Sequence, residues 1–292
     1  MRLAADSART YCGSYLRRPI SRKLLARCCA VLLGVVASVN VAARDDLILR
    51  FAVTTTTDNT GLISHLVPYF ENRHGFTVRV MAGGTGKALR LLVNGDADVA
   101  LTHAPALEQP LVDQGLVLDR QVIMANDFVL VGPADDPARA HTAESAAAAL
   151  AAIAHAQRHF VSRGDESGTH FRERQLWQLA DVTPDGRWYM ETGQGMGKTL
   201  QIAGEFGAYT LSDRGTWLRF GAATGLQLLF ADPPNLQNIY SVLRANPKHN
   251  TDTNERGAKE LATWLRSAEA AALIDGFRIN GKPLFIPAER TR

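Results

Sequence analysis

Cysteine, aromatic residues and long hydrophobic runs are all scarce in this chain of 292 residues. The three cysteines lie within the first 29 residues, so the rest of the chain has no disulfide, no reactive thiol and no cysteine ligand for a metal. Aromatic residues make up 7% of the sequence, which disfavours a surface that stacks nucleic-acid bases. After residue 43, no apolar run is long enough to cross a membrane.

The surplus of positive charge is confined to the N-terminus. The whole chain has a formal net charge of +3, but its first 43 residues hold seven of the 32 basic side chains and one of the 29 acidic ones. The remaining residues therefore carry 25 basic and 28 acidic side chains, a net charge of −3. This acidic body argues against nucleic acid as a partner, and any bound anion must be held by local donors rather than by the overall field.

The first 43 residues have the composition of a secretory signal peptide. A basic stretch from Arg17 to Arg27 precedes an apolar run from Cys28 to Val39, and small residues follow at Val41 and Ala43. We expect cleavage after Ala43 and a mature protein in the periplasm. A lipid anchor is not expected, because an arginine rather than a small residue precedes the cysteine pair. The alternative is a buried N-terminal helix or an uncleaved anchor.

The mature chain alternates between short apolar runs and helical patterns. Buried strands are expected at Leu47–Val53, Phe76–Met81 and Val99–Thr102, with a helix after each of the first two. Further strands are expected at Phe128–Gly132, Phe160–Ser162, Trp188–Glu191 and Tyr209–Leu211. This rhythm predicts an α/β fold in which a mainly parallel sheet is flanked by helices.

Two proline-rich breaks divide the mature chain. Pro133–Pro137 and Asp232–Pro234 flank a middle block, so the chain is expected to leave one lobe and later return to it. The predicted lobe 1 comprises residues 44–131 and 232–292, and the predicted lobe 2 comprises residues 132–231. A ligand cleft is expected between the two lobes.

The turn after the first expected strand is rich in hydroxyl groups. Between that strand and the following helix stand four threonines, Thr54, Thr55, Thr56 and Thr57. A helix N-terminus offers free backbone N–H groups and a partial positive charge, so hydroxyls placed there suit an anion. Ordinary helix capping by Thr57 or Asp58 is the simpler interpretation, but one capping residue would be enough for it.

Glycine-rich turns follow two other expected strands. The segment Gly83–Lys87 lets the backbone approach a ligand closely and adds the hydroxyl of Thr85. A phosphate-binding P-loop needs a longer spacing before its Gly-Lys pair. The first turn lacks that spacing, and the segment Gly193–Thr199 is one residue short of it. Both turns remain candidates for binding a small anion.

The turn after the strand expected at residues 160–162 adds a positive charge. Arg163 presents a planar fork of N–H donors. At the start of the next helix, Ser167, Gly168 and Thr169 add hydroxyl and backbone donors. The alternative is that Arg163 pairs with a carboxylate of the same solvated loop, such as Asp165.

All of these turns lie at the carboxyl ends of expected strands, where open α/β sheets bind their ligands. A cleft between two lobes would therefore gather them around one ligand. Hydroxyls, backbone amides and one arginine suit a small tetrahedral oxyanion. They do not suit a metal cation, which would need carboxylate or imidazole ligands, and no cofactor is expected.

Catalytic and metal-binding interpretations have less support. Ser167 and His170 are three residues apart on one expected helix, and the sequence has no Gly-x-Ser-x-Gly elbow. The eight histidines show no zinc-type spacing. We do not expect an enzyme, and a secreted hydrolase that uses Ser167 or a threonine is the alternative.

Short motifs run in order along most of the mature chain. They are Thr54–Thr57 with Gly61-Leu62, Gly84–Leu89, Asn94–Val99, His103–Ala106, Asn126–Phe128, Val131–Pro137, Phe160–Asp165, Ser167–His170, Gly193–Gly197, Tyr209–Leu211 and Asp213–Thr216. Together they resemble the motifs of the tungstate-binding proteins of ABC transporters. The members of that family are secreted type II solute-binding proteins with two α/β lobes, a hinge and a ligand cleft.

The resemblance implies high-affinity capture of tungstate outside the cytoplasm and its delivery to an ABC permease with its ATPase. It also implies that ligand contacts fall on Thr54–Thr57, Arg163 and Thr169. The threonine signature of the family usually ends in serine, where this chain has Thr57. The physical argument above adds Thr85, Ser167 and Gly168. We expect a monomer.

Molybdate and phosphate are the alternative ligands. Molybdate is nearly the same size and shape as tungstate, and phosphate-binding proteins also carry a Ser-Gly-Thr turn at a helix start. A site made only of donors rejects hydrogen phosphate, because the proton of that ligand needs an acceptor. A carboxylate of Asp58 or Asp165 that faced the anion would favour phosphate.

Overall fold

Parallel strands open the structured part of the chain, which the computed structural model describes for residues 47–232 and 235–288. The expected signal peptide at residues 1–43 lies outside this range. Strand β1 (Ile48–Thr54) pairs in parallel with β2 (Thr77–Gly83) on one side and with β3 (Val99–Thr102) on the other. The carboxyl ends of these three strands therefore lie next to one another.

Strand β4 (Val117–Gly132) takes part in two groups of strands. Up to Asp127 it pairs antiparallel with β9 (Gln237–Ala245), and from Phe128 it pairs antiparallel with β7 (Thr210–Asp213) and β8 (Gln227–Ala231). Together with β12 (Ile286–Pro287), these strands form, within the described residues, an eight-stranded sheet with the main order β12-β4-β9-β3-β1-β2. The sheet is thus mixed, because β9 runs antiparallel to both of its neighbours, β3 and β4.

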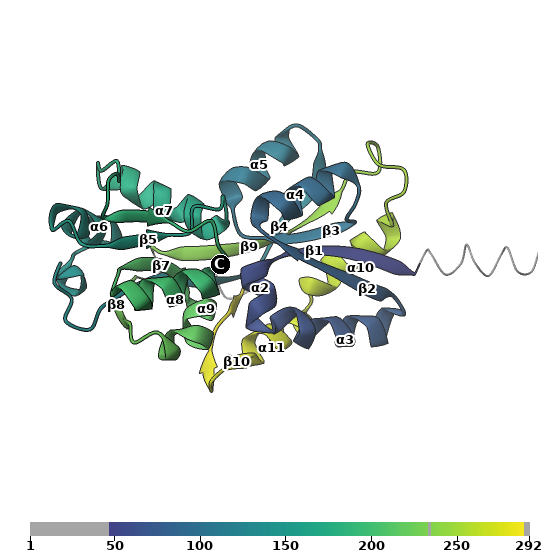
Figure 1. Ribbon diagram of the computed structural model, residues 1–292. Coiled ribbons are helices and arrows are strands. Elements are labelled where there is room, and N and C mark those ends of the chain that lie inside the picture. The colour runs from purple at the N-terminus through teal and green to yellow at the C-terminus, as the bar shows by residue number, and fades with distance from the viewer. Residues whose placement is uncertain (1–46, 233–234, 289–292) are drawn as a thin grey trace, which may run out of the picture. The chain divides into compact units, whose positions relative to one another are not determined.

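Lobe 1, as named from here on, is the group of elements around β1, β2, β3, β9 and the first part of β4. One face of its sheet packs against α3, α10 and α11, and the other packs against α4 and α5 (Figure 1). The bounds of its helices are α2 (Thr55–Thr60), α3 (Leu62–His74), α4 (Thr85–Asn94), α5 (Pro105–Asp113), α10 (Glu255–Leu265) and α11 (Ala268–Gly276). The short strands β10 (Arg278–Ile279), β11 (Lys282–Pro283) and β12 (Ile286–Pro287) follow.

Lobe 2 is the group around the end of β4, β5 (Phe160–Ser162), β6 (Tyr189–Glu191), β7 and β8. Successive side chains of β4 point to opposite faces, so Phe128 and Leu130 join a core with α6 and α7 while Val129 and Val131 join one with α8. The helices are α6 (Ala146–His155), α7 (Gly168–Leu179), α8 (Met196–Phe206), α9 (Arg214–Phe220), η1 (Ala140–Thr142) and η2 (Gly221–Ala223).

The expected strands at Val99–Thr102 and Phe160–Ser162 are confirmed residue for residue, and the others are found within a few residues of their predicted bounds, apart from β4. β4 begins at Val117, eleven residues before its expected start, and β9 was not expected at all. The division into lobes at residues 132 and 231 stays a prediction. Within the described residues, no helix combines the length and the hydrophobicity needed to span a membrane.

Candidate ligand-binding site

The threonine turn (Thr54–Thr57) forms a closed set of hydroxyl contacts. Thr54 caps α2 by accepting a hydrogen bond from the backbone N–H of Thr57 at 3.3 Å, a role we had assigned to Thr57 or Asp58. Its Oγ1 atom also lies 2.6 Å from Thr57 Oγ1 and 3.1 Å from Thr56 Oγ1. All three side chains are buried. The half-buried Thr55 donates to the carbonyl oxygen of Gly83 at 3.4 Å.

The second turn lies directly beside the threonine turn, because Thr54 and Gly83 face each other in the register of β1 and β2. Thr85 is the first residue of α4 and is completely buried. Its hydroxyl oxygen has no hydrogen-bond partner. A buried hydroxyl without a partner is uncommon in folded proteins, so this group calls for an explanation.

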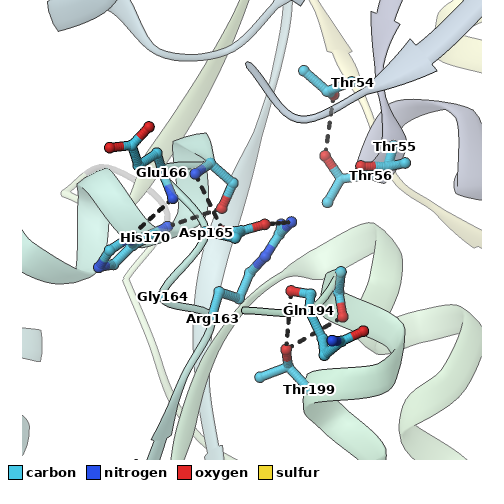
Figure 2. A network of polar contacts seen from close by, with 12 residues as sticks. Thr54, Thr55, Thr56, Arg163, Gly164, Asp165, Glu166, His170, Gln194 and Thr199 are labelled. Carbon is cyan, nitrogen blue, oxygen red and sulfur yellow. Dashed lines mark hydrogen bonds and ion pairs between the residues drawn. The ribbon is translucent and has the colours of Figure 1, made fainter. Parts of the chain in front are cut away.

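The arginine turn (Arg163–Thr169) begins where β5 ends. Arg163 is only 2% exposed, and its Nη2 atom donates to Asp165 Oδ2 at 2.5 Å (Figure 2). The Nε and Nη1 atoms of the same guanidinium are buried and have no partner. The expected alternative, an Arg163–Asp165 pair, is therefore present, but the arginine is buried rather than solvated and keeps unused donors.

The remaining residues of the arginine turn lie at the start of α7. Ser167 is the N-cap and accepts a hydrogen bond from the backbone N–H of His170 at 3.3 Å. Thr169 is completely buried and its hydroxyl has no partner. Gly168 lies against lobe 1, because a Cβ atom at this position would come within 2.7 Å of His103 Cε1. Glycine is therefore needed here for close approach.

Unpartnered buried atoms concentrate on the residues that the sequence singled out. Within the described residues, eight buried side-chain nitrogen or oxygen atoms lack a partner, and four of them belong to Thr85, Arg163 and Thr169. These three residues come from two turns: Thr85 belongs to lobe 1, and Arg163 and Thr169 belong to the arginine turn of lobe 2. Each of the four atoms can donate a hydrogen bond. The turns thus hold a set of buried donors without acceptors.

His103, which follows β3 and lies beside Gly168 of lobe 2, was not among the expected site residues. Its Nε2 atom lies 3.1 Å from Thr56 Oγ1, and its Nδ1 atom lies 2.8 Å from Asn238 Oδ1 on β9. The ring is buried and stacks on Tyr240 with 5.0 Å between the ring centroids. Burial lowers its pKa below the ordinary value, and the hydrogen bond to Asn238 opposes this. The signals in the sequence were its position after a strand and its place in the motif His103–Ala106.

Glu173 is a second residue that the sequence did not indicate. Its buried carboxylate on α7 accepts hydrogen bonds from Ser162 Oγ at 2.8 Å, Trp177 Nε1 at 3.1 Å and the hydroxyl of Tyr189 at 2.8 Å. Ser162 Oγ in turn accepts from the backbone N–H of Gly164 at 3.2 Å. Burial raises the pKa of Glu173 to about 7 despite these donors. The carboxyl group thus supports the backbone on both sides of Arg163.

Comparison with known proteins places the chain in a family. Residues 41–269 match the PBP superfamily domain. The chain is 41% identical over 249 residues to the tungstate-binding protein TupA of Peptoclostridium acidaminophilum, a match that covers 84% of this chain and 86% of that protein. The chain belongs to the tungstate-binding proteins of the PBP superfamily.

Two solved structures of this family agree with the fold. The tungstate ABC transporter structure from Geobacter sulfurreducens is 42% identical with a TM-score of 0.73, and the match covers 79% of this chain and 98% of that one. TupA from Desulfovibrio alaskensis G20 is 41% identical with a TM-score of 0.72, covering 82% and 98% of the two chains. The predicted resemblance and the two-lobed α/β fold of type II binding proteins are confirmed.

The groups considered for catalysis and metal binding are arranged as follows. The hydroxyl of Ser167 bonds to the backbone of His170, whereas the ring of His170 accepts from the backbone N–H of Glu166 at 3.1 Å. Among residues 47–232 and 235–288, no three His, Cys, Asp or Glu side chains are gathered as a bound metal ion would require. Thr199, at the end of the glycine-rich segment Gly193–Thr199, is buried, and its Oγ1 atom lies 3.1 Å from Thr192 Oγ1.

Proposed function

We propose that this protein captures a tetrahedral oxyanion, with tungstate as its ligand, outside the cytoplasm and delivers it to the permease and ATPase of an ABC importer. The observation that carries the proposal is the set of buried donors without partners on Thr85, Arg163 and Thr169. A buried polar group without a partner costs about 1–3 kcal/mol, and more when it is charged. An anion with four acceptor oxygens would satisfy these donors together.

The other predicted residues have supporting places in this proposal. Thr54, Thr55, Thr56 and Thr57 line the lobe 1 side of the site, and Gly168 allows lobe 2 to approach His103. The capping role of Ser167 orders the first turn of α7, which carries Thr169. The names of the relatives, which describe tungstate binding and a tungstate ABC transporter, support the choice of ligand and of a binding rather than a catalytic protein.

Asp165 bears on the choice between tungstate and phosphate. Its Oδ2 accepts from Arg163, and its Oδ1 accepts from the backbone N–H of Ser167 at 3.2 Å. Both oxygens are thus engaged within their own turn. Hydrogen phosphate needs an acceptor for its proton, so this arrangement supports tungstate or molybdate over phosphate.

Thermal unfolding with a panel of oxyanions tests the proposal. A ligand that binds only the folded protein stabilises it by about 4 kcal/mol when present at 1,000 times its Kd. We expect tungstate and molybdate to raise Tm strongly, and sulfate, chromate and phosphate to raise it little. The absence of a shift with any of the five anions would contradict the function, and a shift with phosphate alone would reassign the ligand.

The proposed location outside the cytoplasm rests on the expected signal peptide. Mass spectrometry of the mature protein from a periplasmic extract is expected to give an N-terminus at Arg44, after cleavage behind Ala43. An intact N-terminus in the cytoplasmic fraction would contradict this part of the proposal.

A further inference from the structure

A chain of polar groups connects the threonine turn to an imidazole ring. Thr57 Oγ1 lies 2.6 Å from Thr54 Oγ1, which lies 3.1 Å from Thr56 Oγ1, and Thr56 Oγ1 lies 3.1 Å from His103 Nε2. All four side chains are buried. We call this set the threonine–histidine chain.

The contacts of Asn238 fix the direction of the protons in this chain. Its Nδ2 atom donates to Asn126 Oδ1 and to the hydroxyl of Tyr240, both at 2.9 Å, so its oxygen faces His103 Nδ1. His103 must therefore donate from Nδ1. A neutral imidazole has one N–H group, so Nε2 carries no proton and accepts a hydrogen bond from the hydroxyl group of Thr56.

The remaining hydroxyl protons follow from this assignment. Once Thr56 donates to His103, its oxygen is free to accept from Thr54, and Thr54 accepts from Thr57. Each of the three hydroxyl protons then points along the chain toward His103. With a neutral ring, the threonine turn therefore presents oxygen lone pairs rather than protons to an anion. This arrangement does not suit a ligand that can only accept hydrogen bonds.

We propose that His103 takes up a proton from solvent when the oxyanion binds, and that this turns the threonine hydroxyls into donors toward the ligand. In the charged ring both nitrogens donate, so Nε2 donates a hydrogen bond to the Thr56 oxygen. The hydroxyl group of Thr56 then no longer donates to the ring and can donate elsewhere. The hydroxyl protons of the chain can then turn toward the site. His103 is thus a positioning residue that sets the polarity of the threonine turn. The inference rests on the proposed oxyanion function.

The surroundings of His103 suit a proton that arrives with the ligand. Burial and the positive charge of Arg163 lower the pKa of His103, whereas Asn238 and the carboxylates of Asp213 and Glu108 raise it. A bound dianion would add negative charge beside the ring and raise the pKa further. His103 also lines a pocket of about 260 Å³ between α5, α7 and β9, which gives solvent protons a route to the ring.

Calorimetric titration with tungstate in buffers of different ionisation enthalpy measures the protons taken up on binding. For the wild type between about pH 6 and 8.5, we expect uptake approaching one proton per tungstate and affinity that rises by up to about tenfold for each pH unit lowered. In His103→Gln, which keeps a polar side chain without a titrating group, uptake and pH dependence are expected to disappear. His249→Gln, at an exposed position, is the matched control and is expected to behave as the wild type.

The outcomes separate this inference from the proposed function. Tungstate binding without proton uptake, or uptake that persists in His103→Gln, would overturn the inference and leave the function intact. No tungstate binding by the wild type at any pH would overturn the function itself. If His103→Gln does not fold, ¹⁵N NMR of the wild-type histidine rings decides. We expect one neutral ring protonated at Nδ1 to become doubly protonated on tungstate addition, and no such change would contradict the inference.

Discussion

The threonine turn of lobe 1 and the arginine turn of lobe 2 satisfy their buried polar groups in opposite ways. A hydroxyl both donates and accepts, so Thr54, Thr56 and Thr57 satisfy one another and His103 without a ligand. A guanidinium has five donor hydrogens and no acceptor, and Asp165 engages only Nη2 of Arg163. Under the proposed function, the threonine hydroxyls can therefore bind an anion but do not need one, whereas the unused donors of Arg163 need an acceptor that the anion would supply.

The largest expected effect is the loss of the donors in the arginine turn. Arg163→Ala should weaken tungstate binding at least about a hundredfold, because each hydrogen bond to a charged group contributes about 1.5–3 kcal/mol and two donors are lost. Titration calorimetry at pH 7 measures the change. Arg256→Ala, at an exposed arginine that stacks on Phe76, is the control and should leave the affinity unchanged. An Arg163→Ala affinity close to that of the wild type would remove this residue from the site.

The next effect concerns the carboxyl group that supports the arginine turn. Burial raises the pKa of Glu173 from 4.5 to about 7, so the folded protein holds this proton more tightly than the unfolded chain. The contribution of Glu173 to the stability of the fold is complete below pH 4.5, the pKa of this carboxyl group in the unfolded chain. It is lost as the pH rises through about 7, its pKa in the folded protein. We expect a loss of roughly 2–3 kcal/mol in the free energy of unfolding between about pH 4.5 and 7.5.

Urea unfolding across this pH range measures the effect of Glu173. Glu173→Gln should flatten the slope that this carboxyl group causes, while Glu144→Gln at an exposed position should leave it unchanged. An identical slope in Glu173→Gln and the wild type would show that this carboxyl group titrates alike in the folded and unfolded chains.

A pair of valine substitutions tests the contrast between satisfied and unsatisfied hydroxyls. Thr85→Val removes a buried hydroxyl without a partner, so the free protein should keep or gain stability while tungstate affinity falls about tenfold. Thr57→Val removes a hydroxyl that Thr54 contacts at 2.6 Å, so the free protein should lose about 1–2 kcal/mol. Chemical unfolding without ligand compares the two. Equal destabilisation by both substitutions would contradict the difference proposed here between the unpartnered hydroxyl of Thr85 and the partnered hydroxyl of Thr57.

The smallest effect is expected from the position where this chain departs from the family signature. Thr57→Ser keeps the hydroxyl and removes one buried methyl group, which should lower stability by about 1 kcal/mol. Because the contacts of the hydroxyl are kept, tungstate affinity should change less than about threefold. Calorimetry and urea unfolding of the single variant measure both quantities. A tenfold change in affinity would instead indicate that the methyl group shapes the site.

Local sequence signals predicted the turns, but not the contacts between them. The strand that leads to Arg163 follows from neighbouring residues and is confirmed, and the cap of α9 by Asp213 is equally local. The contact between Thr56 and His103 joins positions 47 residues apart, and that between His103 and Asn238 joins positions 135 apart. No spacing rule reaches over such distances, because the contacts depend on which strands become neighbours.

The two long strands were missed or shortened for a related reason. β9 contains the buried polar residues Asn238 and Ser241, so it lacks the apolar run that identifies a core strand. The start of β4 carries Asp119 and Arg120, which pair with Arg244 and Glu108. Polar residues thus interrupted the hydrophobic pattern on which strand prediction depends.

The place of β9 in the sheet sets the order in which the protein can fold. β9 lies between β3 and β4, although both of these strands precede lobe 2 in the chain. Until residues 237–245 have been made, β3 and β4 keep unpaired edges and lobe 1 cannot close. A polypeptide that ends before Gln237 is therefore expected to lack lobe 1. Because β4 belongs to both groups of strands, we expect the lobes to unfold together in one cooperative transition.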